Sequence, residues 1–360
     1  MENQALKNYC IILAGGIGRR LWPASRKALP KQFIDFFGSG RTLLQQTYDR
    51  FTRFLPKEHI LVSTYEDYVP LVKQQLPDLP PENLLSEPVQ LNTAPAAIWC
   101  TWHTVLRNHN ANILISPADQ MIQDLDRFER QIRKGFLFVE QHPMFLALGV
   151  RPTFPNQAYG YIQMGEGVNG GGLYKVQSFS EKPEAFYAKK FLESGEFLWN
   201  TGIFLWNGQV LGDAIAQKRG RPSVSVDVLA KQMLTIAEEM DYIRASFPQG
   251  MPSSLDLFIL ENCENVAVQE CDFGWADIGC WPELRQSGPK DADGNVVNPG
   301  PKVLLQGTQK CVVRLPEGMK AVIAGLDHYL VAQENGILMI CPNTDPDYVR
   351  RLINEAQMNL

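Results

Sequence analysis

The first half of the chain alternates short apolar runs with segments of helical periodicity. The apolar runs have the length of β-strands and occupy residues 9–14, 60–64, 112–116 and 144–150. Between them apolar residues recur every three or four positions, which predicts helices. This alternation predicts an α/β fold with a mostly parallel mixed sheet that carries helices on both faces. In such a sheet ligands bind at the carboxyl ends of the strands, so we expect the binding and catalytic residues in the loops directly after strands.

The second half of the chain divides into a β-rich stretch, a helical stretch and a tail. Strand patterns cover residues 159–206 and helical patterns return over residues 209–247. Residues 288–301 contain Asp-Gly, Asn-Pro and Gly-Pro pairs, which are typical of a linker. We therefore expect a large first domain over residues 1–288 and a small β-rich domain over residues 289–360.

The expected second domain has short strands separated by glycines, followed by a helix over residues 346–358. The spacing of its strands and glycines hints at a small β-solenoid, a fold in which successive coils stack on one another and of which the left-handed β-helix is one form.

Composition excludes several classes of protein. No apolar run approaches the ~20 residues that span a bilayer, and the N-terminus lacks the layout of a signal peptide, so we expect a cytoplasmic protein without membrane partners. The seven cysteines are scattered and never form a C-x-x-C pair, which favours reduced thiols over disulfides or a zinc site. A net charge of −5 offers no overall attraction for nucleic acid. An anionic ligand would need a local positive cluster.

Such a cluster follows the first predicted strand, which runs directly into Gly15-Gly16-Ile17-Gly18-Arg19-Arg20-Leu21. Glycines after a strand let backbone N–H groups approach an anion. Residues 15–34 hold five basic side chains and no acidic one. Leu21 stands where a dinucleotide fingerprint needs its third glycine, and the Gly-Lys-Ser/Thr of a P-loop is missing. The loop is therefore predicted to bind phosphate in another way, and the alternative is a solvated basic turn.

The segment GGIGRRLWPASRKALPKQF, residues 15–33, resembles the signature of sugar-nucleotide pyrophosphorylases, and of mannose-1-phosphate guanylyltransferases in particular. This resemblance implies a Rossmann-like nucleotidyltransferase fold for residues 1–288. It also implies that Arg20 and Lys31 are catalytic, because they would offset charge at the α-phosphate and the leaving pyrophosphate. The positions implied to bind nucleotide are Leu13, Ala14, Gly15, Gly16, Gly18, Glu87, Asn92, Thr93, Pro117 and Ala118.

Two aspartates are candidate metal ligands. Asp119 directly follows the predicted strand 112–116, and Asp277 lies in the apolar segment Trp275-Ala276-Asp277-Ile278-Gly279. Mg²⁺ prefers one or two carboxylates together with phosphate oxygens and water. Alternatively, Asp119 caps a helix and Asp277 occupies a turn. The resemblance favours Mg²⁺ ligation by both, although Gln120 stands where this branch usually shows histidine.

A further group of residues is predicted to bind a sugar phosphate. Glu181 and Lys182, in a Glu-Lys-Pro sequence, can accept from hydroxyl groups and pair with a phosphate, although a surface charge pair is the common alternative. Asn200 lies within an apolar strand pattern, where its amide must be hydrogen-bonded. The resemblance assigns these three residues and Gly160 to the sugar phosphate.

The resemblance implies that the chain transfers GMP from GTP to α-D-mannose 1-phosphate, releasing pyrophosphate and forming GDP-mannose. A phosphate monoester is already a nucleophile, so positioning and charge neutralisation would be enough for catalysis. The alternatives are a transferase for another base or sugar and a catalytically silent regulatory homologue. Only sixty residues follow Gly300, with a single histidine, so a metal-dependent isomerase module is not expected. The resemblance also suggests a homodimer.

Overall fold

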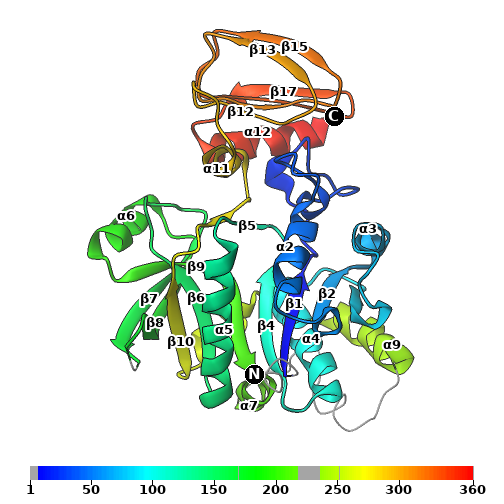
Figure 1. The fold of residues 1–360 in the computed structure, drawn as a ribbon, viewed down its shortest axis with the longest axis vertical. Helices are drawn as coiled ribbons and strands as arrows, with labels where there is room; N and C mark the ends of the chain where they lie inside the picture. Colours follow the sequence, from blue (N-terminus) through cyan, green and yellow to red (C-terminus); the bar gives the residue numbers. More distant parts are fainter. Residues whose placement is uncertain (1–6, 169, 218–235, 251, 360) are drawn as a thin grey trace. The chain divides into compact units, whose positions relative to one another are not determined.

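The computed structural model describes residues 7–168, 170–217, 236–250 and 252–359 (Figure 1). Contacts between residues divide the chain into two compact units. Unit 1 comprises residues 1–15, 48–117 and 122–275, and unit 2 comprises residues 16–47, 118–121 and 276–360. The division rests on contacts alone, and the predicted domain boundary between residues 288 and 289 stays a prediction.

Unit 1 is built on a nine-stranded sheet with the order β3-β2-β1-β4-β9-β6-β10-β8-β7. Its strands are β1 (Asn8–Leu13), β2 (Ile60–Tyr65), β3 (Leu84–Glu87), β4 (Asn112–Pro117), β6 (Phe145–Val150), β7 (Gly160–Gly167), β8 (Leu173–Glu181), β9 (Phe197–Asn207) and β10 (Val266–Cys271). The four strand positions predicted in the first half are confirmed, because they coincide with β1, β2, β4 and β6 to within one residue at each end.

The sheet is mixed, as predicted, but it is not mostly parallel. Parallel pairing joins β3, β2, β1 and β4, and also β6 with β10. Antiparallel pairing joins β9 to β4, β6 and β7, and β8 to β7 and β10. The reason is that the β-rich stretch 159–206 supplies β7, β8 and β9 with only one short helix among them. Helical crossovers are what parallel neighbours require.

Helices cover both faces of this sheet, as predicted. One face packs against α4 (Thr93–Arg107), α7 (Gly208–Gln217), α9 (Ile236–Ser246) and the short α10 (Leu255–Phe258). Strand residues alternate between faces, so Leu146 and Leu205 point the other way, where α5 (Leu125–Gln141) lies along β6 and β9 (Figure 1). Two smaller helices are α3 (Val69–Gln75) and α6 (Ala185–Ser194). The helical prediction over residues 209–247 is met by α7 and α9, and residues 218–235 lie outside the described ones.

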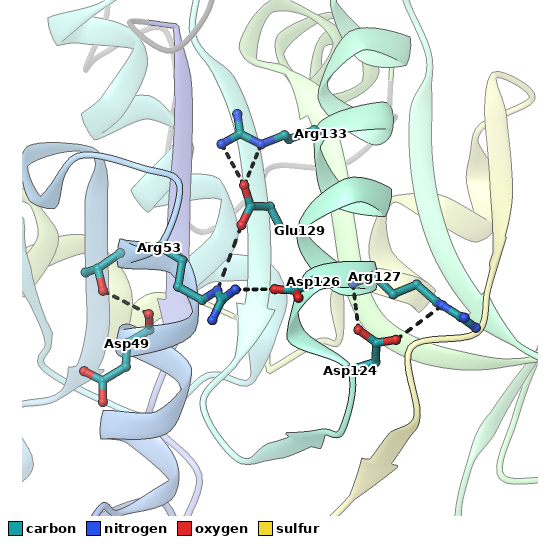
Figure 2. A network of polar contacts seen from close by, with 8 residues as sticks. Asp49, Arg53, Asp124, Asp126, Arg127, Glu129 and Arg133 are labelled. Carbon is teal, nitrogen blue, oxygen red and sulfur yellow. Dashed lines mark hydrogen bonds and ion pairs between the residues drawn. The ribbon is translucent and has the colours of Figure 1, made fainter.

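An ion network fixes the start of α5 to the segment that follows α2 (Leu43–Thr52). Figure 2 shows Arg53 between Asp126 and Glu129, while Glu129 also accepts from Arg133 one turn further along α5. Asp124 caps the helix by accepting from the backbone N–H of Arg127 at 2.8 Å. Exposed pairs contribute little one by one, but a shared network fixes the position of the helix better than an isolated pair.

Unit 2 contains the β-rich tail. Its strands are β12 (Val296–Val297), β13 (Lys302–Gln306), β14 (Val312–Arg314), β15 (Lys320–Ala324), β16 (Tyr329–Glu334) and β17 (Ile337–Pro342). The parallel pairs Lys302–Lys320, Gln309–Asp327 and Val312–Leu330 each join positions 18 residues apart, so successive coils stack on one another. A β-rich C-terminal region is thus confirmed, and the left-handed sense of the coil stays a prediction. The predicted linker 288–301 is wrong in part, because β12 belongs to this stack and pairs with β14.

A single hydrophobic cluster joins the tail to the glycine-rich N-terminal segment. Leu21, Trp22 and Phe36 share this cluster with α11 (Trp281–Ser287), with strands of the stack and with α12 (Pro346–Asn359), which coincides with the predicted terminal helix. Trp281 donates its indole N–H to the carbonyl of Trp22 at 3.0 Å. Unit 2 therefore has a core of its own. No helix among the described residues is long and apolar enough to cross a membrane.

Candidate active site

The predicted nucleotide-binding residues of unit 1 lie at the carboxyl ends of neighbouring parallel strands. Leu13, the last residue of β1, is paired with Pro117, the last residue of β4. Ala14 continues β1 by donating its N–H to the carbonyl of Ser63 in β2 at 2.7 Å. These strand ends therefore lie side by side, as the parallel register requires.

Glu87, at the end of β3, lies directly beside Gly15. A Cβ placed on Gly15 would be 3.7 Å from Oε1 of Glu87. The same carboxylate oxygen accepts from the hydroxyl of Ser63 at 2.7 Å, and Gln90 donates to the carbonyl of Gly15 at 3.0 Å. Glu87 is only 6% exposed, and burial raises its pKa to about 7, against the opposing effect of the Ser63 hydrogen bond. The structure thus places a proton-sensitive carboxyl group next to the predicted phosphate loop.

This raised pKa predicts a pH-dependent stability. Glu87 binds its proton more tightly in the folded state than in the unfolded state, where its pKa is near 4.5. This contribution to the stability of the fold, about 3 kcal/mol at most, is fully present below pH 4.5. It is lost as the pH rises from 4.5 through the folded-state pKa of about 7. Glu87→Gln should flatten this part of the profile in urea unfolding between pH 4.5 and 8. Identical profiles for the two proteins would show that Glu87 titrates normally.

Asn92 and Thr93 are held at the start of α4. Asn92 has a positive φ of 70° and its side chain accepts from the N–H of Thr93 at 2.8 Å, so it caps the helix. The hydroxyl of Thr93 accepts from the N–H of Leu255 at 2.9 Å. These contacts give both residues a structural role, and their predicted contact with a base stays a prediction.

The predicted sugar-phosphate residues are brought together within unit 1. A Cβ on Gly160 would lie 2.6 Å from Oε2 of Glu181 and 3.5 Å from Nδ2 of Asn200, so the three residues converge on one point. Lys182 forms an ion pair with Glu181 and adopts a positive φ of 47°. The absence of a side chain on Gly160 leaves room for a carboxylate and an amide to approach the same group.

Sequence reasoning missed Asp256, which belongs to this group. Its Oδ1 accepts from Nδ2 of Asn200 at 2.6 Å, while Oδ1 of Asn200 accepts from the N–H of Gly202 at 3.0 Å. Burial raises the pKa of Asp256, the Asn200 hydrogen bond opposes that rise, and the charge of Glu181 adds to it. Its only signal in the sequence is a capping serine, Ser254, which marks the start of the four-residue α10.

In unit 2, Lys31 joins the two predicted metal ligands. Its Nζ lies 2.8 Å from Oδ2 of Asp119 and 3.8 Å from Oδ1 of Asp277, and it donates to the carbonyl of Ile278 at 2.9 Å. Lys31 is only 8% exposed. Burial alone would lower its pKa, but the two carboxylates outweigh burial and the pKa is raised. The ammonium group is therefore charged at neutral pH, at a position where a charge without partners would be prohibitive.

Gly18 is required by the packing of Lys31. It has a φ of 69°, and a Cβ at this position would lie 2.7–2.9 Å from three carbons of the Lys31 side chain. The glycine therefore allows the loop to close over the lysine stem, and Lys31 begins the 3-10 turn Lys31–Phe33. Gly16 has open space where a Cβ would be, and Ala118 accepts from the hydroxyl of Thr47 at 3.2 Å.

The guanidinium group of Arg20 lies near Asp277 and near Glu283, a residue that the sequence did not single out. The guanidinium Nη2 of Arg20, Oδ2 of Asp277 and Oε2 of Glu283 each lie 2.8–2.9 Å from the point where a Cβ would stand on Gly279. Glu283 also accepts from the N–H of Gly279 at 3.0 Å. Its position as the third residue of α11 gave no signal, because acidic residues are common in a first helical turn.

The donor set in unit 2 fits a magnesium ion. Both aspartates lie against the Nζ atom of Lys31, at 2.8 and 3.8 Å, and hard carboxylate oxygens are what Mg²⁺ prefers. Among the described residues no cluster offers three or more histidine, cysteine or acidic ligands. Two carboxylates completed by phosphate oxygens and water are the usual arrangement for Mg²⁺ in phosphoryl-transfer enzymes.

Comparison with known proteins agrees with this chemistry. A family model described as nucleotidyl transferase matches residues 9–294. The chain belongs to this family of enzymes. This nucleotidyl transferase is 30% identical over 358 residues to a mannose-1-phosphate guanylyltransferase from Salmonella montevideo, an alignment that covers 97% of the chain and 74% of the relative. It is 31% identical over 350 residues to the alginate biosynthesis protein AlgA of Pseudomonas fluorescens, covering 96% and 71%.

A solved structure extends the similarity of this nucleotidyl transferase to nearly its whole length. A crystal structure described as a mannose-1-phosphate geranyltransferase from Thermus thermophilus aligns with a TM-score of 0.83 at 26% identity. The alignment covers 98% of the chain and 99% of that protein, so it includes the β-rich tail.

Proposed function

We propose that this nucleotidyl transferase transfers GMP from GTP to α-D-mannose 1-phosphate, releasing pyrophosphate and forming GDP-mannose. The observation that carries the proposal is the contact of Lys31 with Asp119 and Asp277, which unites a basic and an acidic motif far apart in the sequence. Relatives named mannose-1-phosphate guanylyltransferase support guanine as the base and mannose 1-phosphate as the acceptor. A cytoplasmic location and a homodimer stay predictions.

Separate groups of residues would bind the triphosphate, the sugar phosphate and the metal ion. Arg20 and Lys31 bind the triphosphate and neutralise negative charge that develops at the α-phosphate and the leaving pyrophosphate. The phosphate of the sugar attacks the α-phosphorus in line, so the residues need only orient it. Gly160, Glu181, Lys182 and Asn200 would hold the sugar phosphate. Asp119 and Asp277 would hold Mg²⁺, which supplies Lewis-acid stabilisation when bound.

The test is a matrix of substrates. The purified chain is mixed with Mg²⁺, one of GTP, ATP, UTP, CTP or dTTP, and one of several sugar 1-phosphates, and pyrophosphate release is followed. The proposal expects the fastest release with GTP and mannose 1-phosphate. A faster reaction with another pair would show that the chain is a nucleotidyl transferase with other substrates. No pyrophosphate release with any pair would overturn the proposal.

A matched pair of glycine variants tests the sugar assignment. Gly160→Ala places a methyl group against Glu181 and Asn200, so the KM for the sugar 1-phosphate should rise about tenfold, the equivalent of one lost hydrogen bond. Gly167→Ala, on the same strand, meets nothing closer than 4.0 Å and serves as the control. The KM for GTP should stay within about twofold in both variants. An unchanged KM for the sugar in Gly160→Ala would remove this group from sugar binding.

A further inference from the structure

The side-chain amide of Asn200 is held at both ends. Its Oδ1 accepts from the N–H of Gly202 at 3.0 Å, and its Nδ2 donates to Oδ1 of Asp256 at 2.6 Å. Gly202 has a φ of 70° and lies in the stretch of β9 where the register with β6 shifts. The two ends of an amide are nearly equal in size, so partners of this kind decide which way it faces. Asn200 therefore turns its NH₂ group, and not its oxygen, toward Asp256.

The Nδ2 atom of Asn200 also lies beside the point on which the predicted sugar-binding residues converge. A Cβ on Gly160 would be 3.5 Å from this nitrogen and 2.6 Å from Oε2 of Glu181. A carboxylate oxygen accepts hydrogen bonds and an amide NH₂ group donates them. A sugar hydroxyl both donates and accepts, whereas a phosphate oxygen would be repelled by the carboxylate. The pair thus matches a hydroxyl group, and Lys182 matches the phosphate.

Asp256 is not needed to hold its own segment in place. The N–H of Leu255 donates to the hydroxyl of Thr93 at 2.9 Å, and Leu255 is buried in the core of unit 1. Ser254 caps the first turn of α10 through its hydroxyl. The side chain of Asp256 instead reaches across to β9, where it accepts from Asn200.

The surroundings of Asp256 disfavour a second carboxylate beside Glu181. Burial raises the pKa of Asp256, the hydrogen bond from Asn200 lowers it, and the charge of Glu181 raises it again. The bond from Asn200 is the largest influence that favours the charged form. The carboxylate and the amide therefore stabilise each other, and each depends on the other for its position.

On the basis of the proposed function, we propose that Asp256 is a positioning residue that fixes the amide of Asn200 as a donor to one hydroxyl of the sugar. The hydrogen bond to Asp256 removes the rotation that the contact with Gly202 alone would leave to the side chain. The NH₂ group then stays beside Glu181, and the two groups bind the same hydroxyl. Asp256 contributes in this way to the choice of sugar without touching it.

The variants Asp256→Leu and Asp256→Asn separate the hydrogen bond from the size of the side chain. Leucine is of similar size and cannot accept a hydrogen bond, whereas asparagine keeps an accepting oxygen. With Mg²⁺ and GTP, kcat/KM is measured for mannose 1-phosphate and for analogues that each lack one hydroxyl group. The ratio between the complete sugar and an analogue measures the discrimination at that hydroxyl. A ratio taken on one preparation is independent of the fraction of folded protein, so a loss of stability does not imitate the effect.

The hydroxyl bound by Asn200 is the one whose discrimination falls in Asn200→Ala. At this hydroxyl Asp256→Leu should lower the discrimination about fivefold to tenfold, the equivalent of one hydrogen bond, and Asp256→Asn should stay within about threefold of the wild-type protein. At the other hydroxyls all ratios should stay within about twofold. An unchanged ratio in Asp256→Leu, or an equal loss in Asp256→Asn, would overturn the proposal.

A double-mutant cycle shows whether the effect runs through Asn200. Adding Asp256→Leu to Asn200→Ala should cause no further loss of discrimination. A further loss of the same size would show that Asp256 acts on the sugar independently of Asn200, and this would overturn the proposal. Ser254→Ala is the matched control, because it weakens α10 without touching Asn200 and should keep the discrimination. An equal loss in Ser254→Ala would show that Asp256→Leu acts only by disturbing α10.

The amide of Asn200 can also be observed without any substrate. Protein labelled with ¹⁵N-asparagine gives side-chain N–H signals in NMR spectra, and those of Asn200 are the ones missing in Asn200→Ala. Loss of the hydrogen bond to the carboxylate should move one of these proton signals upfield in Asp256→Leu and leave it in place in Ser254→Ala. Signals that stay in place in Asp256→Leu would overturn the inference, whichever substrates the chain uses. Signals that move as expected in a protein that releases no pyrophosphate would overturn the proposed function and leave the link between Asp256 and Asn200 intact.

Discussion

Pyrophosphate release should fall by about 10²–10³-fold or more when Asp277 is replaced by asparagine, because a neutral amide is a poor ligand for Mg²⁺ and no longer neutralises it. The fold should survive. Asp277 Oδ1 lies 3.8 Å from Lys31, whereas Asp119, the closer partner, remains in place at 2.8 Å. Because Lys31 keeps Asp119 as its closer partner, loss of the longer contact with Asp277 should cost about 1 kcal/mol or less in stability. Turnover and thermal melting of the same preparation provide the measurement.

Asp293→Asn is a suitable control for this experiment. Asp293 is an exposed aspartate of the same unit, in the turn before β12. Its loss should leave both turnover and melting unchanged. Full activity in Asp277→Asn alongside a normal melting temperature would refute the metal assignment. Asp119→Asn should also abolish turnover, but its direct pairing with buried Lys31 makes a loss of stability a competing explanation.

Replacing Lys31 by methionine should reduce both stability and turnover. Methionine preserves most of the buried stem but leaves Asp119 and Asp277 facing each other without the ammonium group. Removing one member of a buried ion pair costs about 3–5 kcal/mol, and the loss of charge at the reacting phosphates should lower kcat by about 10²–10³-fold. Because the pKa of Lys31 is raised, its ion pairs persist below its ordinary value of 10.5 and are lost only at higher pH. The loss of stability should thus be constant between pH 6 and 9.

Divalent cations provide an internal check on Lys31→Met. Mg²⁺ should raise the melting temperature of the variant more than that of the wild-type protein, since the ion replaces the missing positive charge between the aspartates. Lys290→Met, at an exposed lysine of the same unit, should behave like the wild-type protein. A variant that melts normally and gains nothing from Mg²⁺ would show that Lys31 does not hold the two carboxylates together.

Much of the fold could be predicted because its signals are local. The positions of β1, β2, β4 and β6 follow from short apolar runs, and hydrophobic periodicity is the most reliable sign of secondary structure. Strand direction has no such local signal. The antiparallel placement of β9 between β4 and β6 depends on contacts between residues about fifty to ninety positions apart in the sequence, for example Leu146 with Leu205 and Ile113 with Trp206. The expectation of a mostly parallel sheet failed for this reason.

The candidate site was predictable where a motif carried its residues. Lys31, Asp119 and Asp277 were named from separate segments, and the structure brings them together. Glu283 and Asp256 were missed because an acidic residue in a first helical turn is indistinguishable in sequence from an ordinary helix start. Their neighbours in the structure, Arg20 and Asn200, lie far away in the chain. Only tertiary structure makes such pairs visible.

The shared core of unit 2 limits how this protein can be shortened. The ring of Phe36 lies 5.0 Å beneath the guanidinium group of Arg314, whose side chain also donates to the carbonyl of Asp35. A fragment that stops at residue 288 would strip these supports, together with α12, from the stretch that carries Lys31 and Arg20. The apolar side chains of that stretch would then face water, and the fragment would aggregate. The β-rich tail thus supports the predicted phosphate-binding stretch, and a grafted tail from a distant relative would have to reproduce that interface.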